Sequence, residues 1–420
     1  MRKFILLVLS IVGISSVMYA HEADTLVVHN PRTGAPEVID LPEAMTEQLD
    51  SLLNDWLAKN HLAPLADCRG VSVNPSFNDS AYADRLSRIP SVMEMPYNNV
   101  VRKFIDQYSG KLNGTVSYML GAMNFYMPIF EEVLDKYDLP NELKYLPIIE
   151  SALKPSAVSR AGASGLWQFM LKTAKLYGLK SNSLIDERRD PIKSTHAAAR
   201  YLKELYAIYG DWNLVIAAYN CGPGNVNKAI HRSGGATDYW TIYNHLPRET
   251  RGYVPAFIAA NYIMNYYCLH GISPMNSELP MATDTLMISR DIHFGQVSDL
   301  CKLDIEVIRA LNPQYKKDMV PGNSMECILR LPNEAVATFI DYGDSIYQHR
   351  AAQYLKKRRY VAIKDDAGLT TTGKAKYHTI RQGETLSTIA RRYGTTVNKL
   401  RALNNMKNNK IRAGKRLRVL

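Results

Sequence analysis

The stretch LPIIESALKPSAVSRAGASGLWQFM, residues 146–170, carries most of the information about fold and chemistry. One carboxylate, Glu150, lies within an apolar run, and an apolar wall raises the pKa of a carboxylic acid toward the range useful for a general acid. Small residues at 161–165 let backbone approach a ligand, and the block Leu-Trp-Gln-Phe-Met (166–170) offers a flat face beside an amide. An acid, close backbone and a stacking platform together predict a site that cleaves sugars.

A carboxylate near the end of an apolar helix is more often a solvated residue on the polar face of that helix, and Glu150 alone does not exclude this alternative. The pattern as a whole favours the catalytic interpretation. It resembles the ES…GLWQ(F/I)M signature of the lytic transglycosylases with a goose-lysozyme-like (SLT) catalytic domain, and most nearly their membrane-bound type D.

Two further blocks support this resemblance. Residues 217–224 read AAYNCGPG. This pattern predicts a helix that ends in a Gly-Pro-Gly turn, with Tyr219 and Asn220 in its last turn. This block resembles the family's AYNxGxG motif. Residues 246–255, LPRETRGYVP, resemble the motif whose tyrosine, here Tyr253, reaches the catalytic acid. The blocks stand in the family's order across residues 95–270.

The resemblance implies a role for each matching residue. Glu150 would be the acid and base, Tyr253 would orient it, and Asn220 would hold the acetamido group of the substrate. The remaining substrate-binding residues implied by the blocks are Ser151, Gln168, Phe169, Met170 and Tyr219.

Glycosidases ordinarily use two carboxylates. The motif blocks offer no obvious second one, and Asp186, Glu187 and Asp190 belong to a charged helix start where structural ion pairs are expected. One acid suffices if the acetamido group of murein assists and the C6 hydroxyl of muramic acid attacks, giving 1,6-anhydromuramic acid ends. Two alternatives remain: a hydrolase of the goose-lysozyme type that uses water, and a non-catalytic peptidoglycan-binding scaffold.

A chain of 420 residues is expected to form two to four domains. The predicted fold is mainly α, with a lysozyme-like helical catalytic domain followed by a degenerate LysM-like unit and a βααβ LysM domain. The expected boundaries are 1–20 for a signal peptide, 21–94 for an N-terminal arm without chemistry of its own, 95–275 for the transglycosylase domain, 282–332 for the LysM-like unit, 333–373 for a helical linker and 374–420 for the LysM domain.

The N-terminus predicts export. Arg2 and Lys3 precede an apolar run at 4–17, and the run is too short to span a membrane. No cysteine follows it directly, so we expect no lipid anchor and a protein of the periplasm or cell envelope.

Cysteine and histidine spacing sets further expectations. An odd count of five cysteines leaves at least one thiol unpaired, and Cys301 and Cys327 form the first disulfide candidate because they flank one small unit. The ten histidines show no HExxH spacing and no CxxC is present, so neither a metal site nor a cofactor is expected.

The net charge of +11 is concentrated in the tail. Residues 372–420 hold 13 Lys and Arg against one acidic residue, which makes the tail +12 and the remainder −1. This tail resembles a LysM module, with strands at 377–380 and 416–420 around two helices. The expected partner is the glycan strands of peptidoglycan and not nucleic acid. The glycan-binding positions implied by the resemblance are Gly383, Glu384, Thr385, Leu386, Lys410, Ile411 and Arg412.

Overall fold

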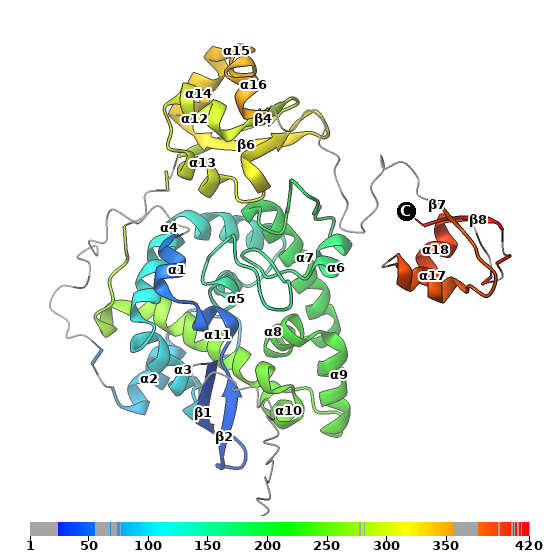
Figure 1. Ribbon diagram of the computed structural model, residues 1–420. Helices are drawn as coiled ribbons and strands as arrows, with labels where there is room; N and C mark the ends of the chain where they lie inside the picture. The colour runs from blue at the N-terminus through cyan, green and yellow to red at the C-terminus, as the bar shows by residue number, and fades with distance from the viewer. Residues whose placement is uncertain are drawn as a thin grey trace, which may run out of the picture. The chain divides into compact units, whose positions relative to one another are not determined.

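The computed structural model divides the chain into two compact units, Met1–Leu355 and Lys356–Leu420 (Figure 1). It describes residues 24–54, 68, 74–75, 77–276, 279–280, 282–355, 377–393, 395–404, 406, 408–409, 411–412 and 414–419. The expected signal peptide lies outside these residues. Within the described part of the chain, no helix has the length and apolar character needed to cross a membrane.

Helices dominate the first unit. They are α2 (Asp79–Ser87), α3 (Asn99–Ser109), α4 (Asn113–Lys136), η5 (Asn141–Tyr145), α5 (Leu146–Ser151), α6 (Leu171–Leu176), α7 (Pro191–Tyr209), α8 (Trp212–Cys221), α9 (Pro223–Arg232), α10 (Tyr239–Ile242), η6 (Tyr243–His245), α11 (Arg248–Tyr266) and η7 (Tyr267–His270). The central helix is α11, which contacts α3, α5 and α8. Its residues from Gly252 to Met264 are all buried, so the core of the domain surrounds this helix.

Local signals in the sequence explain where α7 begins and ends. The Asp190 side chain accepts hydrogen bonds from the backbone N–H groups of Ile192 and Lys193, which are otherwise unpaired in the first turn of a helix. Pro191 occupies the first turn, where its missing N–H costs nothing. The helix ends at Gly210, whose φ of +63° suits glycine. The helix start expected near Asp190 is thus confirmed, and Gly210 explains where the helix ends.

The N-terminal arm contains a β-hairpin that its sequence does not predict. Strand β1 (Thr25–His29) pairs antiparallel with β2 (Pro36–Asp40), followed by η2 (Glu43–Thr46) and α1 (Leu49–Asn54). Val28 and Ile39 are fully buried. The hairpin packs on α11 at Gly252, where a Cβ would lie 2.6 Å from the Asp40 carbonyl oxygen. Glycine therefore allows the arm to close onto the central helix.

A mixed unit follows the helical domain. Its elements are β3 (Thr283–Ile288), β4 (Asp291–His293), α12 (Phe294–Cys301), α13 (Ile305–Leu311), η8 (Lys316–Asp318), β5 (Met319–Pro321), β6 (Cys327–Pro332), α14 (Asn333–Tyr342), α15 (Ser345–Gln348) and α16 (Ala351–Tyr354). Strand β3 pairs antiparallel with β6, and β4 with β5. Helix α14 buries Phe339 and contacts β3, β6 and α12. The first part of the expected linker is thus packed against this unit because its helix has an apolar face.

The mixed unit is docked on the helical domain. Tyr315 forms a β-bridge with Ile185. The Lys316 backbone N–H donates to the Leu184 carbonyl (2.6 Å), and the Asp186 N–H donates to the Gln314 carbonyl (2.8 Å). Leu311 joins the hydrophobic core of the helical domain. The two domains therefore share one folded body.

The disulfide joins Cys68 to Cys268, with 5.0 Å between their Cα atoms. The pairing of Cys301 with Cys327 expected from the sequence is wrong, because both are free thiols. Cys327 is buried in β6, where burial raises the pKa of its thiol and Tyr315 lies within hydrogen-bonding reach. Closeness in sequence misled the prediction, since the actual partners are 200 residues apart.

The second unit has the predicted βααβ order. Its elements are β7 (Tyr377–Thr379), α17 (Leu386–Arg392), α18 (Val397–Leu403) and β8 (Arg416–Arg418), with β7 and β8 antiparallel. A small core of its own contains Leu386, Ile389, Leu400 and Leu417. The mainly α fold class, with lysozyme-like and LysM-type parts, is confirmed.

Candidate active site

Glu150 lies at the end of α5, a helix of six residues. Pro147 occupies the first turn of this helix, so its missing backbone N–H leaves no hydrogen bond broken. Directly after the helix, Ala152 and Leu153 have φ values of +50° and +60°. Left-handed backbone at non-glycine residues costs of the order of 1–2 kcal/mol each. Both side chains are buried, and this packing holds the turn that presents Glu150.

A tyrosine from the central helix orients this acid. The Tyr253 hydroxyl on α11 donates a hydrogen bond to Oε1 of Glu150. Burial raises the pKa of Glu150 to about 8, against the opposing effect of the Tyr253 hydrogen bond, and the charges of Glu249 and Glu43 raise the pKa further. Glu150 therefore holds a proton at neutral pH. Burial and the nearby Glu150 also keep the pKa of Tyr253 well above its usual value, so Tyr253 remains a neutral donor.

The Glu150 side chain lines a small pocket of about 30 Å³. Ser151 and Gln168 line the same pocket, so the structure brings three of the predicted site residues together. The Ser151 hydroxyl donates to the Pro147 and Leu166 carbonyls (3.0 and 2.9 Å) and ties α5 to the loop that carries Gln168. Gln168 has a φ of +44°, and its Nε2 donates to the Gly165 carbonyl (2.8 Å).

The end of α8 approaches Glu150 as well. The Thr250 hydroxyl donates to Oδ1 of Asn220 (2.8 Å), which fixes the orientation of the Asn220 amide. The Tyr219 hydroxyl donates to the Trp167 carbonyl (2.7 Å). The pKa of Tyr219 is raised by burial and then by the charge of Glu150.

The aromatic block does not form the stacking platform that the sequence predicts. Trp167 is fully buried and donates from Nε1 to Oγ1 of Thr195 (2.8 Å). Phe169 is 3% exposed and packs edge-on against Tyr219, so its ring is not available to a substrate. Burial of large aromatic rings contributes strongly to folding free energy, and here both rings lie in the hydrophobic core. Met170, by contrast, is 46% exposed.

A buried ion pair holds the loop of the aromatic block. Arg188 pairs with Asp186 (2.8 Å), and its Nη1 donates to the Gly162 and Phe169 carbonyls (2.9 and 3.1 Å). A Cβ at Gly165 would lie 1.8 Å from the Arg188 carbonyl oxygen, so only glycine fits there. The acidic residues of this region are structural, as the sequence predicts, since Glu187 pairs with a lysine and Asp190 caps α7.

The sequence missed the contribution of the N-terminal arm. Glu43 and Glu47 line the pocket of Glu150. Oε1 of Glu43 accepts the Arg160 backbone N–H (3.0 Å), which fixes this carboxylate beside the loop across the pocket. The arm therefore supplies part of the pocket wall, which the sequence did not predict. No local pattern marks Glu43, because the hairpin that delivers it folds across sequence-distant helices.

In the LysM-type tail the predicted glycan-binding residues divide into two groups. Gly383, Thr385 and Arg412 are exposed, and Ile411 is half-buried. The Glu384 carboxylate is already engaged by His378 Nε2 (2.6 Å) and the Arg381 N–H (2.8 Å). Leu386 is 2% exposed and belongs to the core, so it cannot contact a glycan as predicted. Lys410 lies outside the described residues.

Comparison with known families finds three matches along the chain. Residues 127–241 match the transglycosylase SLT domain. Residues 282–348 match the LysM-like domain of lytic transglycosylase MltD, and residues 378–419 match the LysM domain. Glu150, Gln168 and Asn220 lie within the first match, whereas Tyr253 lies beyond its end. The resemblance predicted from the sequence blocks is confirmed.

Individual relatives agree with these matches. The chain is 29% identical over 331 residues to membrane-bound lytic murein transglycosylase D of Escherichia coli K12, which covers 78% of this chain and 70% of the relative. It is 34% identical over 124 residues to the soluble lytic murein transglycosylase of the same organism, covering 28% and 19% of the two chains. The crystal structure of the 70-kDa soluble lytic transglycosylase of Escherichia coli superposes with a TM-score of 0.32 at 22% identity, over 47% of this chain and 38% of that one.

Proposed function

We propose that this chain, which carries a transglycosylase SLT domain followed by two LysM-type domains, is a lytic transglycosylase that cleaves the β-1,4 bond between N-acetylmuramic acid and N-acetylglucosamine in peptidoglycan. One observation carries the proposal: the Tyr253 hydroxyl donates to the carboxyl group of Glu150, and burial raises the pKa of this carboxyl to about 8. A proton donor of this kind is what cleavage of a glycosidic bond requires first.

The reaction needs one carboxyl group acting twice. Glu150 gives its proton to the glycosidic oxygen as that bond breaks, while the substrate's acetamido oxygen forms a bond to the anomeric carbon. Asn220 holds the acetamido group through the amide that Thr250 orients. The Glu150 carboxylate then takes the proton of the C6 hydroxyl as its oxygen displaces the acetamido oxygen. The product is a 1,6-anhydromuramic acid end, no water is consumed, and Glu150 regains its proton.

An intramolecular attack has a large advantage over attack by water. Effective molarities of well-oriented groups reach about 10⁵–10⁸ M. A hydrolase would need a base to position water, and Glu43 is a candidate because it lines the same pocket. The hydrolase therefore remains the second candidate function, and it differs from the first in the fate of solvent oxygen.

The tail would anchor the enzyme to its substrate. The 372–420 segment carries +12, and murein bears carboxylates on its peptides. The exposed residues Gly383, Thr385 and Arg412 are proposed to contact glycan. Together with the export expected from the N-terminal sequence, the charge of this tail supports a location in the periplasm or cell envelope, bound to peptidoglycan.

The test compares the same change, glutamate to glutamine, at the proposed catalytic position and at an exposed control position. Glu150→Gln keeps the shape of the side chain but removes the titrating proton, so release of soluble muropeptides from purified sacculi should fall by about 10²–10⁴-fold. Glu132→Gln, at an exposed position of α4, should clear sacculi at the wild-type rate. A Glu150→Gln protein that digests sacculi as fast as the Glu132→Gln control would end the assignment.

A further inference from the structure

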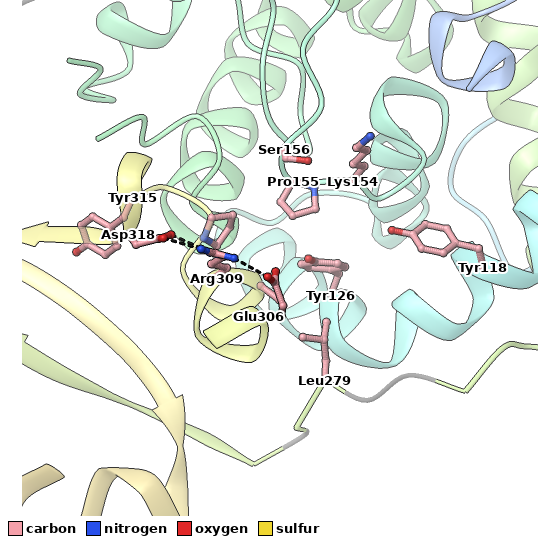
Figure 2. A pocket seen from close by; sticks show the side chains of 12 residues that line it. Tyr118, Tyr126, Lys154, Pro155, Ser156, Leu279, Glu306, Arg309, Tyr315 and Asp318 are labelled. Atoms are coloured by element: carbon pink, nitrogen blue, oxygen red, sulfur yellow. Dashed lines mark hydrogen bonds and ion pairs between the residues drawn. The ribbon is translucent and has the colours of Figure 1, made fainter. Parts of the chain in front are cut away.

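Two cavities in the described part of the first unit share no lining residue with the pocket of Glu150. In the cavity beside the mixed unit, Arg309 pairs with both Glu306 and Asp318, so these charges are engaged within the protein (Figure 2). The other cavity, of about 760 Å³, is within the usual range of about 300–1,000 Å³ for ligand pockets. We call it the α8 pocket, and it is lined by residues 92–94, 138–140, 203, 206 and 210–213.

The α8 pocket lies at the end of α8 that is opposite to the candidate active site. Its lining residue Asn213 is the second residue of this helix, whereas Asn220, which approaches Glu150, is the second from the other end. Seven positions along an α-helix correspond to a rise of about 10.5 Å. A ligand in the α8 pocket therefore occupies a place separate from the proposed catalytic acid.

Two aromatic rings form part of the wall of the α8 pocket. The rings of Tyr206 and Trp212 stack, with 4.2 Å between their centroids and an angle of 17° between their planes. They flank Gly210, where α7 ends before α8 begins. Tyr206 is nevertheless 39% exposed. Because each ring holds the other in place, a ligand would meet an aromatic surface that is already ordered, and little entropy is lost on binding.

The polar side chains of the α8 pocket differ in whether the fold already uses them. Asp211 caps α8, and Lys203 donates to a backbone carbonyl at the end of α4 (2.8 Å), so both have structural partners. Within the part of the chain that the structure describes, no hydrogen bond or ion pair engages the Glu94 carboxylate, the Tyr206 hydroxyl or the Trp212 Nε1–H. The groups available to a ligand are therefore one carboxylate, one hydroxyl and one indole N–H, beside two rings.

A buried asparagine adds an independent observation. Asn213 is only 4% exposed, and its Nδ2 donates to the Glu94 carbonyl (3.2 Å), which holds the segment that carries Glu94 against α8. Its Oδ1 has no hydrogen-bond partner among the residues that the structure describes. Buried side-chain acceptors are usually paired, so this oxygen favours a ligand that brings a hydrogen-bond donor.

These groups fit a sugar better than an anion or a purely apolar ligand. A pyranose ring presents a face of C–H groups to an aromatic ring, and it carries hydroxyl groups around its rim. Such hydroxyls donate to carboxylate or amide oxygens and accept from an indole N–H. An anion is disfavoured because the lining holds three carboxylates and one ammonium group, which belong to Glu94, Asp138, Asp211 and Lys203.

We infer that the α8 pocket is a second binding site for β-1,4-linked N-acetylated glycan, separate from the site of cleavage. The inference rests on the proposed function for the identity of the glycan, and it adds a place where the same polymer is held without being cut. Attachment at this pocket and at the LysM-type tail would keep the enzyme on the sacculus between cleavage events, because two weak contacts with one polymer reinforce each other.

Titration of the full chain with chitotetraose, followed by tryptophan fluorescence, tests the inference. This tetramer of N-acetylglucosamine contains no muramic acid, so it is not the proposed substrate and its binding is measured without turnover. The emission of the wild type should change and saturate. Trp212→Phe should lose most of this change, because the reporting indole is in the pocket. Trp240→Phe, on α10 and outside the pocket, should keep it.

Two further variants measure the contribution of the pocket to affinity. Tyr206→Ala should raise the half-saturating concentration about tenfold through loss of one ring contact. Tyr342→Ala is its matched control, because this tyrosine on α14 is also 39% exposed and lies outside the pocket, and it should titrate as the wild type does. Glu94→Ala, at an exposed position, should raise the concentration about fivefold, so the test stays decisive even if Tyr206→Ala folds poorly.

The outcomes separate this inference from the proposed function. No emission change up to millimolar chitotetraose, or a change that Trp212→Phe retains in full, would overturn the inference even if sacculi are digested normally. It is equally overturned if Tyr206→Ala lowers the unfolding temperature but binds as Tyr342→Ala does, since the rings then serve only to pack the turn between α7 and α8. A response to trilysine but none to chitotetraose would assign the pocket to cations instead. Failure to digest sacculi counts against the proposed function alone.

Discussion

Replacing Glu150 by glutamine should make the folded protein more stable at neutral pH, although it removes the proposed catalytic group. A catalytic carboxyl that is buried among apolar residues is held there at a cost in stability. The pKa of Glu150 is raised from 4.5 to about 8 by burial. The folded chain therefore holds a proton that the unfolded chain releases, throughout the interval between these two values.

The sign and size of the effect follow from linkage. Between pH 4.5 and about 8 the folded state binds one proton more than the unfolded state, so the free energy of unfolding falls as pH rises. Each pH unit in this interval lowers the free energy of unfolding by about 1.4 kcal/mol. Between pH 4.5 and 7 the wild-type protein therefore loses about 3 kcal/mol of stability. Glutamine does not titrate and can still accept the Tyr253 hydrogen bond. The variant should match the wild type near pH 4 and exceed it by about 3 kcal/mol at pH 7.

Urea unfolding of both proteins at several pH values measures this difference. The difference between Glu150→Gln and wild type should be close to zero at pH 4 and grow up to about pH 8, where Glu150 begins to ionise in the folded state as well. Glu132→Gln, with an exposed side chain, should show no such growth. A difference that is flat across this range would refute the raised pKa, and with it the proposal that Glu150 acts as a general acid at neutral pH.

Three further predictions follow from the site and its supports. Tyr253→Phe removes a hydrogen bond that lowers the pKa of Glu150, so the alkaline limb of the pH–rate profile should move to higher pH while the maximal rate falls; an unchanged limb would contradict the contact. Arg188→Met removes the cation that pairs directly with the buried Asp186 and should cost about 3–5 kcal/mol of unfolding free energy in urea, whereas an effect below about 1 kcal/mol would contradict a buried pair. Cys68→Ser should lower stability by about 2–5 kcal/mol in oxidising buffer, and a reductant should erase the difference from wild type.

The parts that could be predicted from sequence are those determined locally. Asp190-Pro191 and Gly210 mark the ends of α7 because caps act on neighbouring backbone groups. Glu150 and Tyr253 could be paired only through the family resemblance, since no local signal joins residues 103 positions apart. Their contact depends on how α5 packs against α11.

The failures concern burial and long-range pairing. The aromatic residues Trp167 and Phe169 could form a stacking surface for a sugar, but the sequence does not show whether an aromatic ring is buried or exposed, and both rings are buried. Ile208 likewise lies on α7 with helical spacing from the buried residues of that helix, and it is nevertheless 60% exposed. The arm's carboxylates and the Cys68–Cys268 pair are set by tertiary packing, which periodicity does not report.

Digestion of sacculi in ¹⁸O-labelled water tests the central claim most directly. If the C6 hydroxyl of the substrate is the nucleophile, mass spectrometry should show anhydromuramyl ends as the dominant product with no label incorporated. These ends differ from reducing ends by one water. Labelled reducing ends as the main species would contradict the transglycosylase mechanism and identify a hydrolase, with Glu43 as the first residue to substitute in search of its base.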